Sequence, residues 1–194
     1  MRHWSALRAG TVAALLMTWP LAAAMSDRSV AFVPWKVLDP SSPSSGALMI
    51  LYWIPSQPDE LKRSDMVHSK TLMAYAARCV AMRVVRADDS VRLASLDVSQ
   101  KLPLAILVDA EGKVIGRLGG GGAPLRSLDV EMMVRTAFDE RELSAEAMLD
   151  TARARVAAGD RMSAADLYSQ VLAQRCAFPR LAKEAHRALR KLER

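Results

Sequence analysis

Apolar and polar positions along this chain follow two different periods, one typical of strands and one of helices. The run from Ala47 to Ile54 is continuously apolar and has strand length, which predicts a strand buried on both faces. From Asp59 the apolar residues recur at helical spacing and predict a helix of about twenty residues, with Pro58 in its first turn. The segment from Cys79 to Val85 is rich in β-formers again, so a second strand is expected there.

The most informative pattern begins at residue 103. Leu104 to Val108 predicts a buried strand, and Val114 to Leu118 predicts its antiparallel partner across a turn in which Gly112 supplies the positive φ. Four glycines then precede a helix expected from about Leu125 to Glu140. The glycine run lacks the G-x-x-x-x-G-K-[ST] pattern, so it predicts a flexible corner rather than a phosphate-binding loop.

Two weaker patterns complete the order of elements. Asp88 or Asp89 can cap a short helix between the second strand and the hairpin. A short strand is also expected before the Pro/Ser-rich loop Asp39 to Gly46. The predicted order is therefore β-α-β-α-β-β-α, preceded by one short strand.

The C-terminal part carries only helical patterns. Ser144 can cap a helix that runs to about Ala158, where Gly159 ends it. The segment Ser163 to Asp166 has the form of a capping box for the next helix, and Pro179 begins a third. Their short connections make these helices antiparallel neighbours.

The first residues have the pattern of a secretory signal. A basic start precedes the apolar stretch AGTVAALLM and a small-residue site that ends at Ala24. We expect cleavage after Ala24 and a periplasmic or secreted mature chain. Retention as a membrane anchor is the alternative, although the apolar stretch is shorter than the roughly 18–20 residues that a span needs.

Composition indicates a globular protein, and the charge is concentrated at one end. Apolar residues make up 51% and charged residues 25%. Loss of Arg2 and Arg8 with the signal lowers the net charge from +6 to +4. The last twenty residues hold seven cations and two acids: Arg175, Arg180, Lys183, Arg187, Arg190, Lys191 and Arg194 against Glu184 and Glu193. Such a tail could contact nucleic acid or anionic lipid, but it has few aromatic residues for stacking. A solvated helix face is therefore favoured, and nucleic acid is not expected as a partner.

The order of these elements resembles the thioredoxin superfamily over residues 47–140. The resemblance rests on the LYW end of the first core strand, on Pro103 before the third, and on the Asp-x-x-Gly-Lys turn. It implies an α/β fold, a thioredoxin-like sheet flanked by helices. It also implies a cis proline at Pro103, with the backbone of Leu102 facing a binding groove. Only about 5–6% of X-Pro bonds are cis, so that expectation depends on the resemblance.

The chain departs from this family at the position of its chemistry. The family places a Cys-x-x-Cys motif at the N-terminus of the first helix, where the helix dipole favours a thiolate. The corresponding residues here are Gln57, Pro58, Asp59 and Glu60. None of them can attack a disulfide, so we expect a degenerate site without enzyme activity and without a cofactor.

The helical tail resembles a tetratricopeptide unit. Gly159, Ala164 and Tyr168 match the small and aromatic packing positions of that repeat, whereas Met148 and Arg155 depart from it. The expected organisation is a signal peptide (1–24), an N-terminal strand and loop (25–46), a thioredoxin-like domain (47–140) and a small all-α helical tail (141–194).

Cys79 and Cys176 are the only cysteines, and three interpretations of them stay open. A disulfide would join the tail to the sheet. Cys79 is otherwise a small buried hydrophobe at the start of a strand, or an atypical redox thiol. His68 and His186 have no second ligand at helical spacing, so no metal site is expected.

These patterns favour a redox-inactive, exported protein that binds other proteins or extended peptide segments. It is similar in outline to bacterial holdase chaperones that couple a degenerate thioredoxin domain to tetratricopeptide helices. One alternative is a thiol-disulfide oxidoreductase that uses an atypical single cysteine. Another is a structural accessory subunit of an envelope complex.

Overall fold

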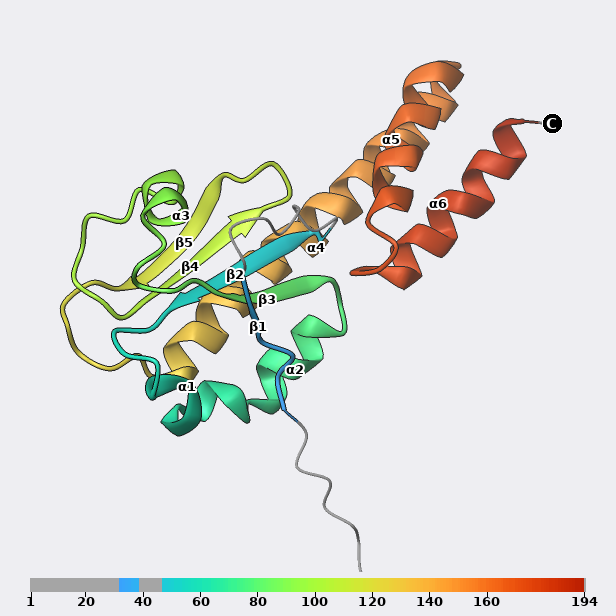
Figure 1. Cartoon of the computed structure of the whole chain (residues 1–194). Coiled ribbons are helices and arrows are strands. Elements are labelled where there is room, and N and C mark those ends of the chain that lie inside the picture. Colours follow the sequence, from blue (N-terminus) through green and yellow to red (C-terminus); the bar gives the residue numbers. More distant parts are fainter. Residues whose placement is uncertain (1–31, 39–46, 194) are drawn as a thin grey trace, which may run out of the picture.

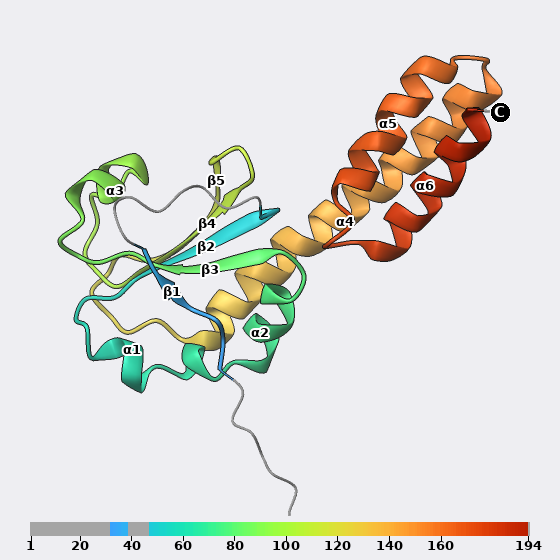
Figure 2. The same ribbon diagram turned by 45° about the vertical axis from the view of Figure 1, so that its right-hand side comes forward.

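The chain forms an α/β body with a helical tail that extends from it (Figures 1 and 2). The structure is a computed structural model, and it describes residues 32–38 and 47–193. The expected signal segment and the whole loop Asp39 to Gly46 lie outside the described residues. Within the described ranges, no helix is long and apolar enough to cross a membrane.

A mixed sheet of five strands forms the centre of the body. The strands are β1 (Lys36–Val37), β2 (Met49–Ile54), β3 (Val80–Val84), β4 (Leu104–Asp109) and β5 (Val114–Gly119). Their order is β1-β3-β2-β4-β5. Strand β3 runs parallel to β1 and β2, whereas β4 runs antiparallel to β2 and β5. The core strands and the hairpin that the sequence predicts are confirmed, and the N-terminal strand is only two residues long.

The alternation of side chains along the strands divides the core between the two faces of the sheet. Met49, Leu51 and Trp53 of β2 point to one face, where they join the larger hydrophobic cluster. Tyr52 and Ile54 join a smaller cluster on the other face. Helices α2 (Lys70–Ala76) and α4 (Ser127–Ala157) cover the first face, and α3 (Ser90–Ser95) lies on the opposite side (Figure 1). The central strand is therefore buried on both faces, as the apolar run predicts.

The prediction of a single helix after Pro58 is wrong. The chain forms α1 (Glu60–Arg63), then the 3₁₀ turn η1 (Asp65–Val67), and then α2. The Ser64 hydroxyl oxygen accepts a hydrogen bond from the Met66 amide (3.3 Å), and that of Ser69 accepts one from the Leu72 amide (3.0 Å). Serine side chains that bind nearby amides offer the backbone an alternative to continuous helix. Each serine therefore starts a new short element.

The β4–β5 hairpin closes on a buried carboxylate. Asp109 Oδ1 accepts hydrogen bonds from the amides of Glu111 (3.1 Å) and Lys113 (2.8 Å), and Gly112 has the expected positive φ of 84°. The second carboxylate oxygen of Asp109 lies 3.3 Å from the Arg141 guanidinium of α4. This ion pair fixes the turn against the helix that leads into the tail.

Helix α4 corrects the expectation of two separate helices. Its 31 residues run without interruption through Ser144, which therefore lies inside the helix and does not cap one. No glycine or proline occurs between Ser127 and Ala157, so nothing in the backbone stops the helix. The boundary expected between residues 140 and 141 lies within this helix, which passes from the body into the tail (Figure 2).

Helices α5 (Arg161–Ala173) and α6 (Pro179–Leu192) complete the tail. Gly159 ends α4 with a φ of 83°, and Pro179 begins α6, as predicted. The N-cap of α5 is Asp160 rather than Ser163: Asp160 Oδ1 accepts from the Ser163 amide (3.1 Å). Hydrogen bonds from Ser163 lower the pKa of the Asp160 carboxyl below its ordinary value.

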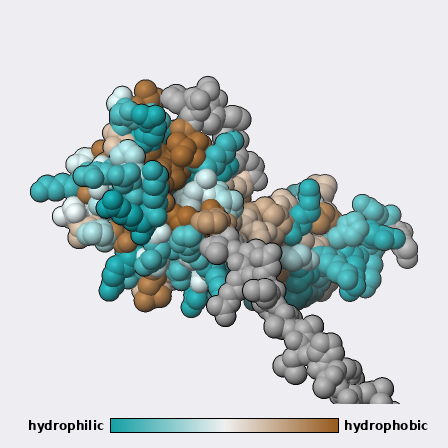
Figure 3. Space-filling view, turned by 60° about the horizontal axis from the view of Figure 1, so that its bottom comes forward, coloured by the Kyte–Doolittle hydropathy of each residue, from teal (hydrophilic) through white to brown (hydrophobic). Residues whose placement is uncertain are grey.

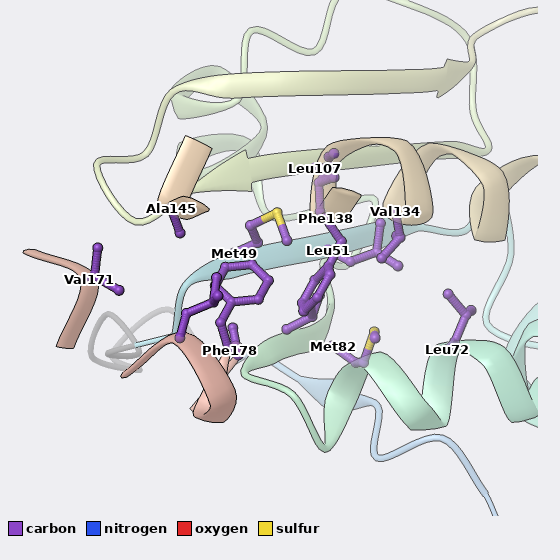
Figure 4. Packing of buried hydrophobic residues seen from close by; sticks show 14 of the residues in the cluster. Met49, Leu51, Leu72, Met82, Leu107, Val134, Phe138, Ala145, Val171 and Phe178 are labelled. Atoms are coloured by element: carbon purple, nitrogen blue, oxygen red, sulfur yellow. The ribbon is translucent and has the colours of Figure 1, made fainter. Parts of the chain in front are cut away.

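Three interactions dock the tail on the body, and they all lie around the loop between α5 and α6. Phe178 is buried and its ring lies 4.9 Å from that of Phe138, among residues of the sheet (Figure 4). The Arg78 guanidinium lies 4.2 Å from the centre of the Phe138 ring and donates two hydrogen bonds to the Ala177 carbonyl (3.2 and 3.1 Å). Cys79 follows Arg78 in the chain, and Cys176 precedes Ala177. These two cysteines form a disulfide with their Cα atoms 5.8 Å apart.

This bridge predicts a large stability difference between the wild type and the double variant Cys79→Ser/Cys176→Ser. The cysteines are 97 residues apart, so the bridge restricts a long loop in the unfolded chain. We expect the variant to lose about 2–5 kcal/mol of unfolding free energy. This loss is measured by unfolding both proteins in guanidinium chloride, with circular dichroism as the signal.

The reduced wild type is the control, because reduction should cost as much stability as the two substitutions. A loss below about 1 kcal/mol in both samples would mean that the bridge contributes little to stability.

Candidate functional site: the groove beside Pro103

An open groove of about 480 Å³ lies between α1, the loop of Pro103 and the start of α4. Its lining consists of Trp53, Glu60, Arg63, Ser64, Asp65, Met66, Pro103 and the segment 124–128. Trp53 and Met66 are each only 1% exposed, whereas Leu128 at the rim is 59% exposed. The groove therefore combines a fixed apolar floor with an accessible apolar side chain at its edge.

A second tryptophan holds the floor in place. The Trp35 ring packs edge-on against Trp53 at 5.3 Å between centroids. Its indole nitrogen donates to the Met66 carbonyl (3.3 Å). One residue thus contacts the ring of Trp53 and the backbone of Met66.

The loop that enters β4 presents backbone groups beside this groove. The Leu102–Pro103 peptide bond is cis, and the Pro103 carbonyl accepts from the Gly120 amide (3.2 Å). Among the described residues, the amide and carbonyl of Leu102 have no hydrogen-bond partner. These unpaired groups directly precede Pro103, which lines the groove.

The four positions at which the resemblance places a Cys-x-x-Cys motif lie at the other wall. Gln57, Pro58 and Asp59 are exposed and do not line the groove, whereas Glu60 does. Both carboxylate oxygens of Glu60 are engaged by Ser56, one by its amide (2.6 Å) and the other by its hydroxyl (3.0 Å). The carboxylate therefore ties the loop to α1, a helix of only four residues.

Charges around the groove are nearly balanced. Two cations line it, Arg63 and Arg126, together with the acids Glu60 and Asp65. Arg126 forms a two-pronged pair with Asp129 (2.7 and 2.8 Å). The hydrogen bonds from Arg126 lower the pKa of the Asp129 carboxyl below its ordinary value. This balance suits a ligand held by backbone and apolar contacts better than one of high charge.

The cysteines lie far from this groove. Trp53 marks the groove end of β2, whereas the Cys79 carbonyl accepts from the Leu48 amide (3.0 Å) at the opposite end of the strand. Six extended residues separate these ends by about 20 Å. The disulfide instead borders a second hollow of about 430 Å³ between body and tail, and Cys176 is exposed there. The structure therefore does not bring the cysteines to the groove.

His68 and His186 also lie apart from each other. The His68 ring is 4.9 Å from that of Phe32, and His186 is exposed on α6. Across residues 32–38 and 47–193, no three His, Cys, Asp or Glu side chains gather in a way that could hold a metal ion.

The sequence did not reveal that the segment 124–128 forms a wall of the groove. The glycine run was the available signal, because Gly119 lets two loops approach closely. A Cβ at Gly119 would lie 2.4 Å from the Pro103 carbonyl oxygen, and its φ is 96°. The corner is thus shaped by close backbone contact rather than by flexibility alone.

This contact predicts that Gly119→Ala is more destabilising than Gly112→Ala. Both glycines have a positive φ, which costs an alanine about 1–2 kcal/mol, but a Cβ at Gly112 meets nothing within 4 Å. The clash at Gly119 should add about 1–3 kcal/mol. Equilibrium unfolding of both variants measures the difference, and equal losses would contradict the proposed role of the close contact.

Comparison with known proteins adds no assignment to this geometry. Neither the models of known protein families nor the curated proteins give a match to the chain.

Proposed function

We propose that this protein has a thioredoxin-like fold without dithiol chemistry and binds extended polypeptide segments in the groove beside Pro103. The observation that carries the proposal is the unpaired backbone of Leu102, the residue before Pro103 in the lining of the groove. The sheet order β1-β3-β2-β4-β5 supports the fold assignment.

An extended peptide suits both the polar and the apolar features of this groove. Its main chain can pair with the Leu102 amide and carbonyl, as a strand does with a sheet edge. Its side chains can cover Trp53 and Leu128, while the balanced charges allow segments of varied composition. Such contacts depend little on sequence, which is the requirement for a chaperone-like binder with many clients.

The surroundings of α1 support a binding role over an enzymatic one. The carboxylate of Glu60 is engaged by Ser56, and Gln57 to Asp59 carry no nucleophile. An exported location, as the signal pattern predicts, agrees with a disulfide, because oxidising compartments preserve such bridges. The helical tail then offers a second surface for protein contacts.

The groove can be tested with the pair Leu128→Gln and Met132→Gln. These residues lie one turn apart on α4 and are 59% and 50% exposed, but only Leu128 lines the groove. Titration calorimetry against an unfolded polypeptide should show about fivefold weaker binding for Leu128→Gln, equivalent to roughly 1 kcal/mol of lost apolar burial. Met132→Gln should bind as the wild type does.

Two results would count against this proposal. Absence of binding by the wild type at high micromolar polypeptide would remove it. Equal weakening in both variants would place the contact on α4 outside the groove.

A second candidate, thiol-disulfide exchange through the bridge, is favoured by the exposure of Cys176. Attack on that sulfur by an external thiolate would release the Cys79 thiolate and form a mixed disulfide. Because the bridge also closes a long loop, we expect it to resist a glutathione buffer. Differential alkylation with a mass readout tests this. A labile bridge or a trapped mixed disulfide would instead place exchange chemistry ahead of binding.

A further inference from the structure

Helix α6 has two opposite faces of very different character. Leu181, Ala182 and Ala185 are buried against the tail. The opposite face is exposed and carries Lys183, Arg187, Arg190 and Lys191, which we call the basic stripe. Because successive residues turn by about 100°, these four positions fall within an arc of about 100°. The stripe extends over about 12 Å of helix.

Several other charges of the tail form ion pairs with neighbours. Arg180 lies 2.8 Å from Glu146 of α4, and Arg153 of α4 pairs with both Asp150 and Glu184. Glu184 is the acid closest in sequence to the stripe, and it is therefore engaged. In the part of the chain that the structure describes, no stripe residue has an ion-pair partner.

The place of α6 in the molecule leaves the stripe open to a large surface. The tail extends away from the sheet, and α6 forms one of its outer sides (Figures 1 and 2). Hydrophilic side chains gather over the far part of the tail (Figure 3). A planar partner can therefore approach this end without meeting the body.

We propose that the basic stripe of α6 docks the protein on a membrane surface rich in anionic lipid headgroups. The argument is charge complementarity: four clustered cations near an anionic leaflet each add to binding. Lipid headgroups diffuse laterally, so an anion can take its place at each cation. The apolar face of α6 is already buried, so the contact is peripheral and electrostatic rather than inserted.

Nucleic acid suits the stripe less well. Helix α6 has no Phe, Tyr or Trp between Pro179 and Leu192, so His186 offers the one ring of this helix on which a base can stack. Binding to a phosphate backbone alone remains an outcome that the test can distinguish. The proposal is independent of the groove, which lies on the body.

The test uses the full chain and three variants. In the stripe variant, Lys183, Arg187, Arg190 and Lys191 become Gln. In the matched control, four exposed cations of the body become Gln: Lys36, Lys101, Lys113 and Arg135. The third variant exchanges lysine and arginine within the stripe (K183R/R187K/R190K/K191R) and keeps its charge. All proteins retain the same residues 1–24, so any contribution of that segment is equal.

Flotation is measured with vesicles of phosphatidylglycerol and phosphatidylcholine in equal parts, and with phosphatidylcholine alone. We expect the wild type, the matched control and the charge-preserving variant to bind the anionic vesicles. Their binding should weaken strongly as the salt concentration rises. The stripe variant should bind at least about tenfold more weakly. Circular dichroism should show the same helix content in all four proteins.

Three results would overturn the proposal. An equal loss of vesicle binding in the stripe variant and the matched control would show that only the net charge matters. Equal binding to both kinds of vesicle would show that headgroup charge is irrelevant. Tighter binding to a DNA duplex than to anionic vesicles at the same salt would assign the stripe to nucleic acid.

Discussion

The arrangement of this protein depends on one continuous helix that is shared between its two parts. The first half of α4 buries Val130, Val134 and Phe138 against the sheet, and its second half buries Ala145 and Leu149 against the tail. These residues belong to a single hydrophobic cluster, so the tail cannot tilt without disturbing the core of the body. The contacts of Arg78 and the disulfide hold the α5–α6 loop to the same body. The tail is therefore an extension of the body rather than a flexibly linked domain.

This construction separates the candidate chemistries along the sheet. The groove lies at one end of β2, where the loop of Pro103 meets the start of α4. The disulfide lies at the other end, where Cys79 enters β3. A ligand in the groove does not contact the disulfide. Loss of peptide binding in the groove can therefore be observed separately from loss of thiol-disulfide exchange at the bridge. The proposed peptide binding thus needs no participation of the cysteines.

Much of the sheet could be predicted from sequence, because burial on both faces leaves a clear apolar run in β2 and β4. Gly112 and Pro179 likewise mark their turn and helix start through backbone constraints. The helix boundaries were harder to predict, because they depend on whether a serine side chain binds a nearby backbone amide. Ser64 and Ser69 do so and interrupt one expected helix, whereas Ser144 lies inside a helix that continues. In the groove, the resemblance pointed to Pro103 and Leu102. The wall formed by residues 124–128 depends on tertiary packing that spacing alone does not encode.

The distribution of charge gives the two proposed surfaces different physical characters. Around the groove, Arg126 is paired with Asp129, and the lining acids offset its cations, so long-range attraction contributes little there. On α6, neighbours neutralise Arg180 but none of the described residues pairs with Arg187 or Lys191. Binding at the groove should therefore depend weakly on salt, and binding through the stripe strongly. Because the two surfaces lie on different parts of a rigid assembly, occupation of one leaves the other accessible. A protein held electrostatically by its tail could thus still present its groove to an extended segment.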